Sequence, residues 1–116
     1  MLYGFNGKVQ YYLYGQPADM RKGFDGLCGL VINHLRANPQ SGDVYIFINR
    51  ARTHIKLLVW DQGGFVIYYK RLEQGTFEMP LPGEGEKALC ITRQKLMLIL
   101  EGISLKKVVR RKRFLA

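Results

Sequence analysis

The sequence has no apolar run long enough to form a membrane-spanning helix. Its longest apolar run near the C-terminus covers only residues 96–100, whereas a bilayer span needs about 20 residues. The N-terminal residues also lack the basic segment followed by an apolar stretch that marks a secretory signal. We therefore expect a cytoplasmic protein with no membrane partner.

Cysteine and histidine are both scarce, which argues against a structural metal site. Cys28 and Cys90 lie far apart in the sequence, and the histidines are His34 and His54. Without a Cys-x-x-Cys pair or a Cys/His cluster, a zinc site has too few ligands at suitable spacing. Both cysteines have apolar neighbours, so we expect small buried side chains in a reducing compartment, with no metal and no cofactor.

Recognisable catalytic motifs are absent as well. No Gly-rich phosphate loop ending in Gly-Lys-Ser/Thr occurs, and no Ser/His/Asp or Cys/His arrangement can be argued from the spacing. A metal-dependent nuclease would need clustered carboxylates, for which Asp43 and Asp61 are the best-placed candidates beside predicted strands. Both also adjoin turn glycines, where Asp commonly forms local hydrogen bonds. We expect a protein that is not an enzyme, and keep the nuclease as a third hypothesis.

What the chain does have is an excess of positive charge, unevenly placed. It carries 18 Lys and Arg against 9 Asp and Glu, a net charge of +9 with a pI near 9.8. Six of these cations lie within residues 106–113, and the remaining chain carries +3. The 116 residues suit one domain. We predict a single domain over residues 1–105 and a basic C-terminal tail over residues 106–116.

Runs of apolar and β-branched residues predict the strands. They cover residues 8–14, 44–49, 55–60 and 65–72, with a further short extended piece at residues 76–78. The last three of the long runs follow one another at about ten-residue spacing, which favours consecutive antiparallel pairing.

Two helices are predicted, one between the first two of these strands and one after the last. Apolar residues from Met20 to Leu35 recur with helical period, and Asp19 is placed to cap that helix. Glycines at positions 23, 26 and 29 indicate that the helix starts late, near Gly23, or packs closely on its glycine side. Thr92 can cap a second helix over residues 93–101, which Gly102 ends. The predicted fold is α+β, an antiparallel β-meander of four to five strands with two packed helices and a basic tail.

Several segments share their order and spacing with one known family. Residues 17–27 read Pro-Ala-Asp-Met-Arg-Lys-Gly-Phe-Asp-Gly-Leu, residues 55–61 read Ile-Lys-Leu-Leu-Val-Trp-Asp, and residues 69–77 read Tyr-Lys-Arg-Leu-Glu-Gln-Gly-Thr-Phe. Shorter matches occur at residues 41–47, 64–65 and 100–103. Together they resemble the Orf2-like accessory proteins, also called TnpB, of bacterial insertion-sequence-66 transposons, which are unrelated to the RNA-guided nuclease of that name. Met79 departs from the pattern, since an aromatic residue is expected before Pro80.

This resemblance implies a role in transposition beside a separate, larger transposase, encoded by a mobile genetic element. It supplies no catalytic residues. We therefore predict a non-catalytic accessory protein that binds nucleic acid, with DNA as the expected ligand, and assists the transposase.

Three groups of basic residues are the candidate nucleic-acid contacts, because Lys and Arg neutralise phosphates and release counterions. They are Arg21 and Lys22 before the first helix; Arg50, Arg52, Lys56, Lys70 and Arg71 in the meander; and Lys106, Lys107, Arg110, Arg111, Lys112 and Arg113 in the tail. If the meander strands pair as hairpins, its cations gather at one end of the sheet. Six tail contacts on duplex DNA would give a slope of log K against log salt of about −5.

Each group also has a simpler interpretation. The tail can be a solvated segment, and Arg21 can pair with Asp25 on a helix. Tyr68, Tyr69 and Trp60 can interleave with the cations, as in single-strand binders, or Trp60 and one tyrosine can belong to the core. Strand alternation puts Tyr68 and Tyr69 on opposite faces.

The main alternative function is a protein-interaction subunit that does not bind DNA directly. The helix around residues 96–100 is apolar on nearly all sides, and the first helix has a glycine side. In this alternative, those surfaces contact the transposase or a second copy of the chain.

Overall fold

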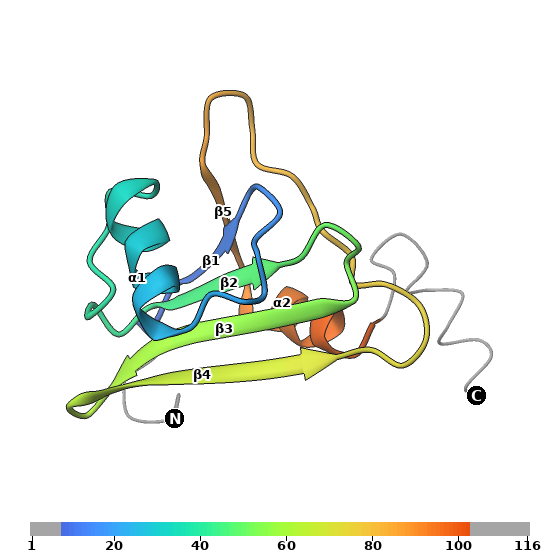
Figure 1. The fold of residues 1–116 in the computed structure, drawn as a ribbon. Helices are drawn as coiled ribbons and strands as arrows, with labels where there is room; N and C mark the ends of the chain where they lie inside the picture. Colours follow the sequence, from blue (N-terminus) through green and yellow to red (C-terminus); the bar gives the residue numbers. More distant parts are fainter. Residues whose placement is uncertain (1–7, 103–116) are drawn as a thin grey trace.

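The computed structural model describes residues 8–102, which form an α+β fold (Figure 1). The predicted tail lies outside these residues. The elements are β1 (Tyr11–Tyr14), α1 (Phe24–Asn33), β2 (Val44–Ile48), β3 (His54–Asp61), β4 (Gly64–Arg71), β5 (Ala88–Ile91) and α2 (Arg93–Leu100). No helix in this part of the chain is of a length and apolarity to span a bilayer.

The five strands form one mixed sheet in the order β4-β3-β2-β1-β5. The meander β2–β3–β4 is antiparallel, as predicted. The prediction of an entirely antiparallel sheet is wrong, because β1 runs parallel to β2, with Tyr11 opposite Val44. Parallel neighbours need a long crossover connection, usually a helix, and the chain between β1 and β2 carries α1.

The second edge of the sheet also differs from the prediction. Residues 88–91, for which no strand was predicted, form β5, which pairs antiparallel with β1. Residues 76–78, expected to extend the sheet, form no strand. Phe77 is nonetheless fully buried in the core, so its apolar side chain serves packing rather than a ladder.

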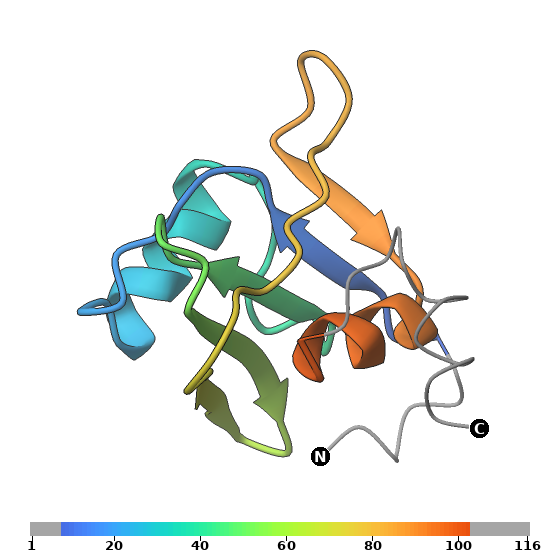
Figure 2. The ribbon, with the colours of Figure 1, turned by 90° about the vertical axis from the view of Figure 1, so that its right-hand side faces the viewer.

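The two helices cover opposite faces of the sheet, as Figure 2 shows. We call these the α1 face and the α2 face. On the α2 face, Ile55 and Leu57 pack with Leu96 and Ile99. On the α1 face, Leu58 and its neighbours pack with Leu27 and Val31. Alternation along β3 therefore decides which core each side chain enters.

Helix α1 starts at Phe24, so the late start is the correct alternative. Asp19 does not cap the helix, contrary to the prediction. Its Oδ1 instead accepts a hydrogen bond from the Arg21 backbone N–H at 2.9 Å, in a turn that precedes the helix. Gly23 occupies the N-cap position and makes no side-chain cap.

The second helix agrees with its sequence signals. Thr92 Oγ1 accepts from the Lys95 N–H at 3.1 Å, and Gly102 follows the helix with φ of 74°. Leu96 and Ile99 are fully buried, so packing on the sheet accounts for most of the apolar surplus of this helix.

The two cysteines have different environments, and the prediction that both are buried is wrong. Cys28 is half-buried in α1, and burial raises the pKa of its thiol. Cys90 is exposed, because it belongs to the edge strand β5. Its Sγ lies 3.4 Å from Gln10 Oε1, to which it donates.

Candidate nucleic-acid interface

The turn between β2 and β3 presents two arginines at one end of the sheet. Asn49 organises this turn, because its Oδ1 accepts from the backbone N–H groups of Thr53 at 2.9 Å and His54 at 3.0 Å. Arg50 and Arg52 follow Asn49 and are both exposed. Arg52 has a φ of 59° and its N–H donates to the Asn49 carbonyl. The turn is therefore fixed by its polar residue while the arginine side chains face solvent.

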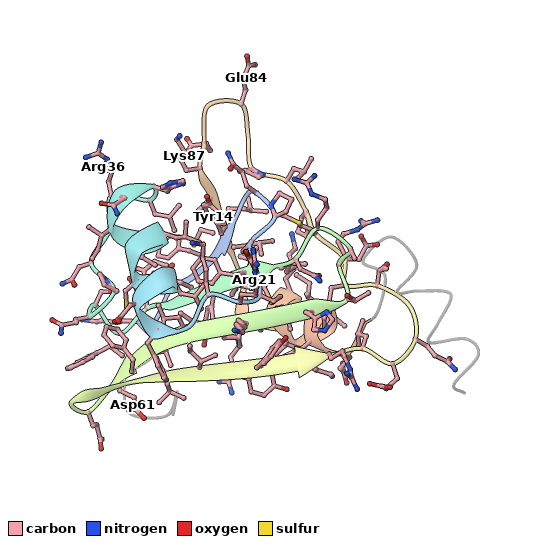
Figure 3. The ribbon with its side chains drawn as sticks, viewed as in Figure 1. Tyr14, Arg21, Arg36, Asp61, Glu84 and Lys87 are labelled. Carbon is pink, nitrogen blue, oxygen red and sulfur yellow. The ribbon has the colours of Figure 1, made fainter. Side chains whose placement is uncertain are left out.

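The register of β3 and β4 brings Arg71 to the same end. His54 pairs with Arg71 and Ile55 with Lys70, so the predicted placement of these residues beside the β2–β3 turn is correct. We define the basic rim as Arg50, Arg52 and Arg71. Figure 3 labels Asp61 at the opposite end of the β3–β4 hairpin. The positively charged rim and the carboxylate of Asp61 therefore lie at opposite ends of these two strands.

Arg71 also has an acidic neighbour. Its Nε lies 3.0 Å from Glu73 Oε2, and both side chains are well exposed to water. Exposed ion pairs of this kind contribute little free energy. A phosphate can therefore compete for the Arg71 guanidinium at small cost.

Two of the predicted contacts turn away from solvent instead. Lys56 is only 8% exposed, and its Nζ donates to the carbonyls of Met20 and Lys22, each at 2.8 Å. Lys70 Nζ donates to the Leu100 carbonyl at the end of α2, at 2.6 Å. A cation at a helix C-terminus also complements the negative end of the helix dipole. Both ammonium groups hold backbone segments against the sheet, so we leave them outside the rim.

Arg21 lies on the side of the sheet that α1 covers (Figure 3). Lys22 lies on the same side, since its carbonyl accepts from Lys56 Nζ. Arg21 does not pair with Asp25, contrary to the sequence alternative, because it lies in the turn before the helix. Its guanidinium instead donates hydrogen bonds to Asp19 Oδ2, from Nη2 at 2.7 Å and from Nε at 3.1 Å. This hydrogen bonding lowers the pKa of Asp19 to about 2 and raises that of Arg21.

The aromatic residues Tyr69 and Trp60 lie toward opposite ends of the β3–β4 hairpin. Tyr69 is 53% exposed and its ring centre lies 5.9 Å from that of His54. Together with Arg71 and Glu73 these two rings line an open hollow of about 320 Å³ beside the rim. Tyr68 lies on the opposite face, as predicted. Trp60 packs edge-on against Phe65 at the far end of the hairpin, so it does not interleave with the rim cations.

A larger hollow, of about 460 Å³, lies near the other edge of the sheet and was not predicted. Its lining includes Tyr12, Tyr45, Asp43 and Lys87. The rings of Tyr12 and Tyr45 stack with centres 5.8 Å apart, and burial raises the pKa of both hydroxyls. This stack depends on the parallel β1–β2 pairing, so no local sequence signal could have revealed it.

The carboxylates considered for a nuclease are divided by the sheet. Asp43 lines the hollow on the α1 face, and its Oδ1 accepts from the Gln10 N–H at 3.1 Å. Asp61 shares the alternation of Ile55 and Leu57, which face α2. Among residues 8–102, no three His, Cys, Asp or Glu side chains lie close enough together to hold a metal ion.

Six of the predicted contacts belong to the tail and lie outside the described residues. They are Lys106, Lys107, Arg110, Arg111, Lys112 and Arg113. The structure therefore brings together the three rim arginines and places Arg21 and Lys22 on the α1 face, and the tail contacts stay predictions.

Comparison with known proteins gives one family and no solved structure. The family described as IS66 Orf2 like protein matches residues 9–110. Two relatives come from Sinorhizobium fredii (strain NBRC 101917 / NGR234). "Uncharacterized protein y4jC" is 32% identical over 83% of this chain and 80% of its own length, and "Uncharacterized protein y4hO" is 34% identical over 82% and 81%. No solved structure has significant similarity to the chain.

Proposed function

Because this chain belongs to the family of IS66 Orf2-like proteins, we propose that it is a non-catalytic accessory protein of DNA transposition. In this proposal it binds nucleic acid through basic residues and assists a separate transposase, which is its protein partner. Family membership supports the association with transposition. The nucleic-acid contact rests on the placement of charge.

The observation that carries this proposal is the convergence of the rim arginines. Arg50 and Arg52 come from one turn and Arg71 from a strand distant in sequence, yet strand register joins them at one sheet end. Guanidinium groups bind phosphate oxygens through paired N–H donors. Three such groups, two on a hydrogen-bonded turn and one on a strand, form a surface that can follow a phosphate backbone. The tail would add contacts independent of sequence.

A salt series tests the rim and the tail separately. Each phosphate contact on duplex DNA contributes about −0.9 to the slope of log K against log salt. We expect the triple variant Arg50→Ala/Arg52→Ala/Arg71→Ala to flatten the slope by nearly 3, and a chain ending at residue 105 to flatten it by about 5. Binding is measured by fluorescence anisotropy with a labelled duplex and a labelled single strand.

The control variant removes the same charge from elsewhere. Arg36→Gln/Lys87→Ala/Arg93→Ala also takes away three exposed cations, and Figure 3 labels Arg36 and Lys87 well away from the rim end of the hairpin. This variant should keep the wild-type slope. If the rim variant and the control lose affinity equally, the effect is bulk charge and the rim has no specific role.

The second candidate function is a protein-interaction subunit that contacts the transposase or a second copy without binding DNA. Exposed apolar side chains on β4 favour it, since Val66, Tyr68 and Tyr69 all face solvent. A rim variant that binds no DNA but still supports transposition, together with a stable complex between the chain and the transposase, would favour this function over the first.

A further inference from the structure

Strand β4 forms one edge of the sheet and exposes one side of its backbone. Among residues 8–102, no strand other than β3 pairs with it. The Leu72 N–H donates to the Thr53 carbonyl at 2.9 Å, which fixes the hydrogen-bonding phase of the pair. Alternate residues therefore direct their N–H and C=O groups away from β3. These outward residues are Phe65, Ile67, Tyr69 and Arg71.

This edge lacks most of the features that prevent strand addition. β4 has eight residues, whereas the opposite edge strand β5 has four. Its centre, residues 65–69, reads Phe-Val-Ile-Tyr-Tyr and carries no charge or proline. Charged side chains, prolines and short length are the usual means of protecting an edge. Here the cations Lys70 and Arg71 lie only at one end.

Exposed apolar side chains concentrate on the same edge. Val66 is 36% exposed and Tyr68 41% exposed on the α2 face, and Tyr69 is exposed on the α1 face. Next to them, Phe65 lines a hollow of about 410 Å³ with Cys28 and Ile32 of α1, and Ile32 is itself half exposed. The apolar surface therefore continues from the strand onto the flank of the helix.

We propose that the outer edge of β4 pairs antiparallel with β4 of a second copy of this chain, around a twofold axis at Ile67. The hydrogen-bonded pairs are Ile67 with the partner's Ile67 and Phe65 with the partner's Tyr69. Between them, Val66 lies opposite the partner's Tyr68. The two five-stranded sheets then form one continuous sheet.

Charge placement selects this occupant and this direction. In the antiparallel pair, Lys70 and Arg71 lie opposite the partner's Gly64 and Gly63, which have no side chains. The cations of the two copies therefore lie at opposite ends of the paired strands. The two Arg71 residues are roughly 27 Å apart, because eight residues of extended strand separate their positions. A parallel pair would instead bring both sets of cations side by side, which is destabilising. Shifting the register by two residues would place Val66 against the partner's Lys70 and lose an apolar pair.

The ring of Tyr69 fits the same arrangement. Lys56 Nζ, from β3, lies over one face of the ring at 4.6 Å from its centre, and the side chain of Tyr69 is 53% exposed on the edge strand. In the proposed register the partner's Phe65 lies directly opposite Tyr69 and would cover part of its exposed ring. Aromatic pairs across neighbouring strands are among the most favourable cross-strand contacts.

Sedimentation equilibrium of the full chain, without nucleic acid, tests the dimer independently of the proposed function. We expect a monomer–dimer equilibrium. Tyr68→Lys should raise the dissociation constant of the dimer at least tenfold, because the substituted lysines of the two copies would lie near each other across the twofold axis. Ile67→Pro should also prevent pairing, since it removes an outward N–H that the β3 ladder does not use. Ile67→Val keeps that N–H and the branched side chain, and should leave the dimer intact. Leu81→Lys, at an exposed loop position, is the matched charge control.

Cross-linking tests the register. In a Cys28→Ala/Cys90→Ser background, a single Ile67→Cys should form a disulfide-linked dimer under mild oxidation, and Leu81→Cys should not. A chain that remains monomeric at several hundred micromolar overturns the proposal. So does a dimer unaffected by Tyr68→Lys and Ile67→Pro, or one that cross-links through Tyr68→Cys but not through Ile67→Cys. If only a complex with the transposase is sensitive to Tyr68→Lys, the edge accepts a different partner and the second-copy proposal fails.

Discussion

The ammonium group of Lys56 lies 4.6 Å from the centre of the Tyr69 ring and is held between that ring and two backbone carbonyls. The carbonyls belong to Met20 and Lys22, in the segment that leads into α1. A buried cation requires compensation, and here it receives two hydrogen bonds and a ring face. Lys56 thus holds the segment before α1 against the sheet. Because its two carbonyl partners flank Arg21, this contact also sets the position of Arg21.

Removing this ammonium should destabilise the protein. Lys56→Met keeps much of the apolar stem but leaves the Met20 and Lys22 carbonyls without their donor. We expect a loss of about 2–3 kcal/mol in the free energy of unfolding, measured by urea denaturation. Lys87→Met, at an exposed position, should change it by less than about 0.5 kcal/mol. An equal effect of the two substitutions would contradict the role assigned to Lys56.

Asp19 should make stability depend on pH in the acidic range. Its pKa is lowered from 3.8 to about 2 by hydrogen bonds from Arg21. Because the folded-state pKa lies below the unfolded value, the stabilisation is present above pH 4 and is lost as pH falls toward 2. Carboxyl NMR titration should give the low pKa in the wild type and a higher pKa in Arg21→Ala, which removes the side-chain hydrogen bonds and keeps the one from the backbone N–H. A titration unchanged by Arg21→Ala would mean that the pair does not form in solution.

The helix glycines should respond differently to alanine. At Gly29, an added Cβ would find only Asn33 Nδ2, at 4.0 Å, so Gly29→Ala should stabilise the protein by about 0.5–1 kcal/mol. At Gly26, a Cβ would lie 2.9 Å from Lys22 Cβ, so the backbone near Lys22 would have to shift. Gly26→Ala should therefore gain nothing or destabilise. Thermal unfolding of the two variants gives the comparison, and an equal gain at both sites would refute the close approach of Lys22.

The cap of α2 offers a fourth measurement. Thr92→Ala removes the acceptor of the Lys95 N–H and should cost about 1 kcal/mol in the free energy of unfolding. Thr92→Ser retains the hydroxyl and should stay close to the wild type. If serine and alanine were equally destabilising, the methyl group of Thr92 rather than its hydroxyl would be the important contact.

The local parts of the fold were predictable because neighbouring residues encode them. The β2–β3–β4 meander follows from alternating apolar runs joined by short turns, and α2 follows from Thr92, an apolar repeat and Gly102. The gathering of Arg50, Arg52 and Arg71 was predictable for the same reason, since hairpin pairing brings the start of β3 beside the end of β4.

The remaining features depend on contacts between distant segments, which local patterns do not specify. The sequence by itself determined the charge excess, the hairpins and the second helix. Only the tertiary structure decided that β1 runs parallel to β2, that β5 completes the sheet and that Cys90 is exposed. It also decided that Lys56 and Lys70 bind carbonyls instead of facing solvent, because those carbonyls come from segments 30 to 36 residues away. Strand alternation determines on which face of the sheet a charged side chain lies. The packing of other segments on that face decides whether the charged group is exposed to water.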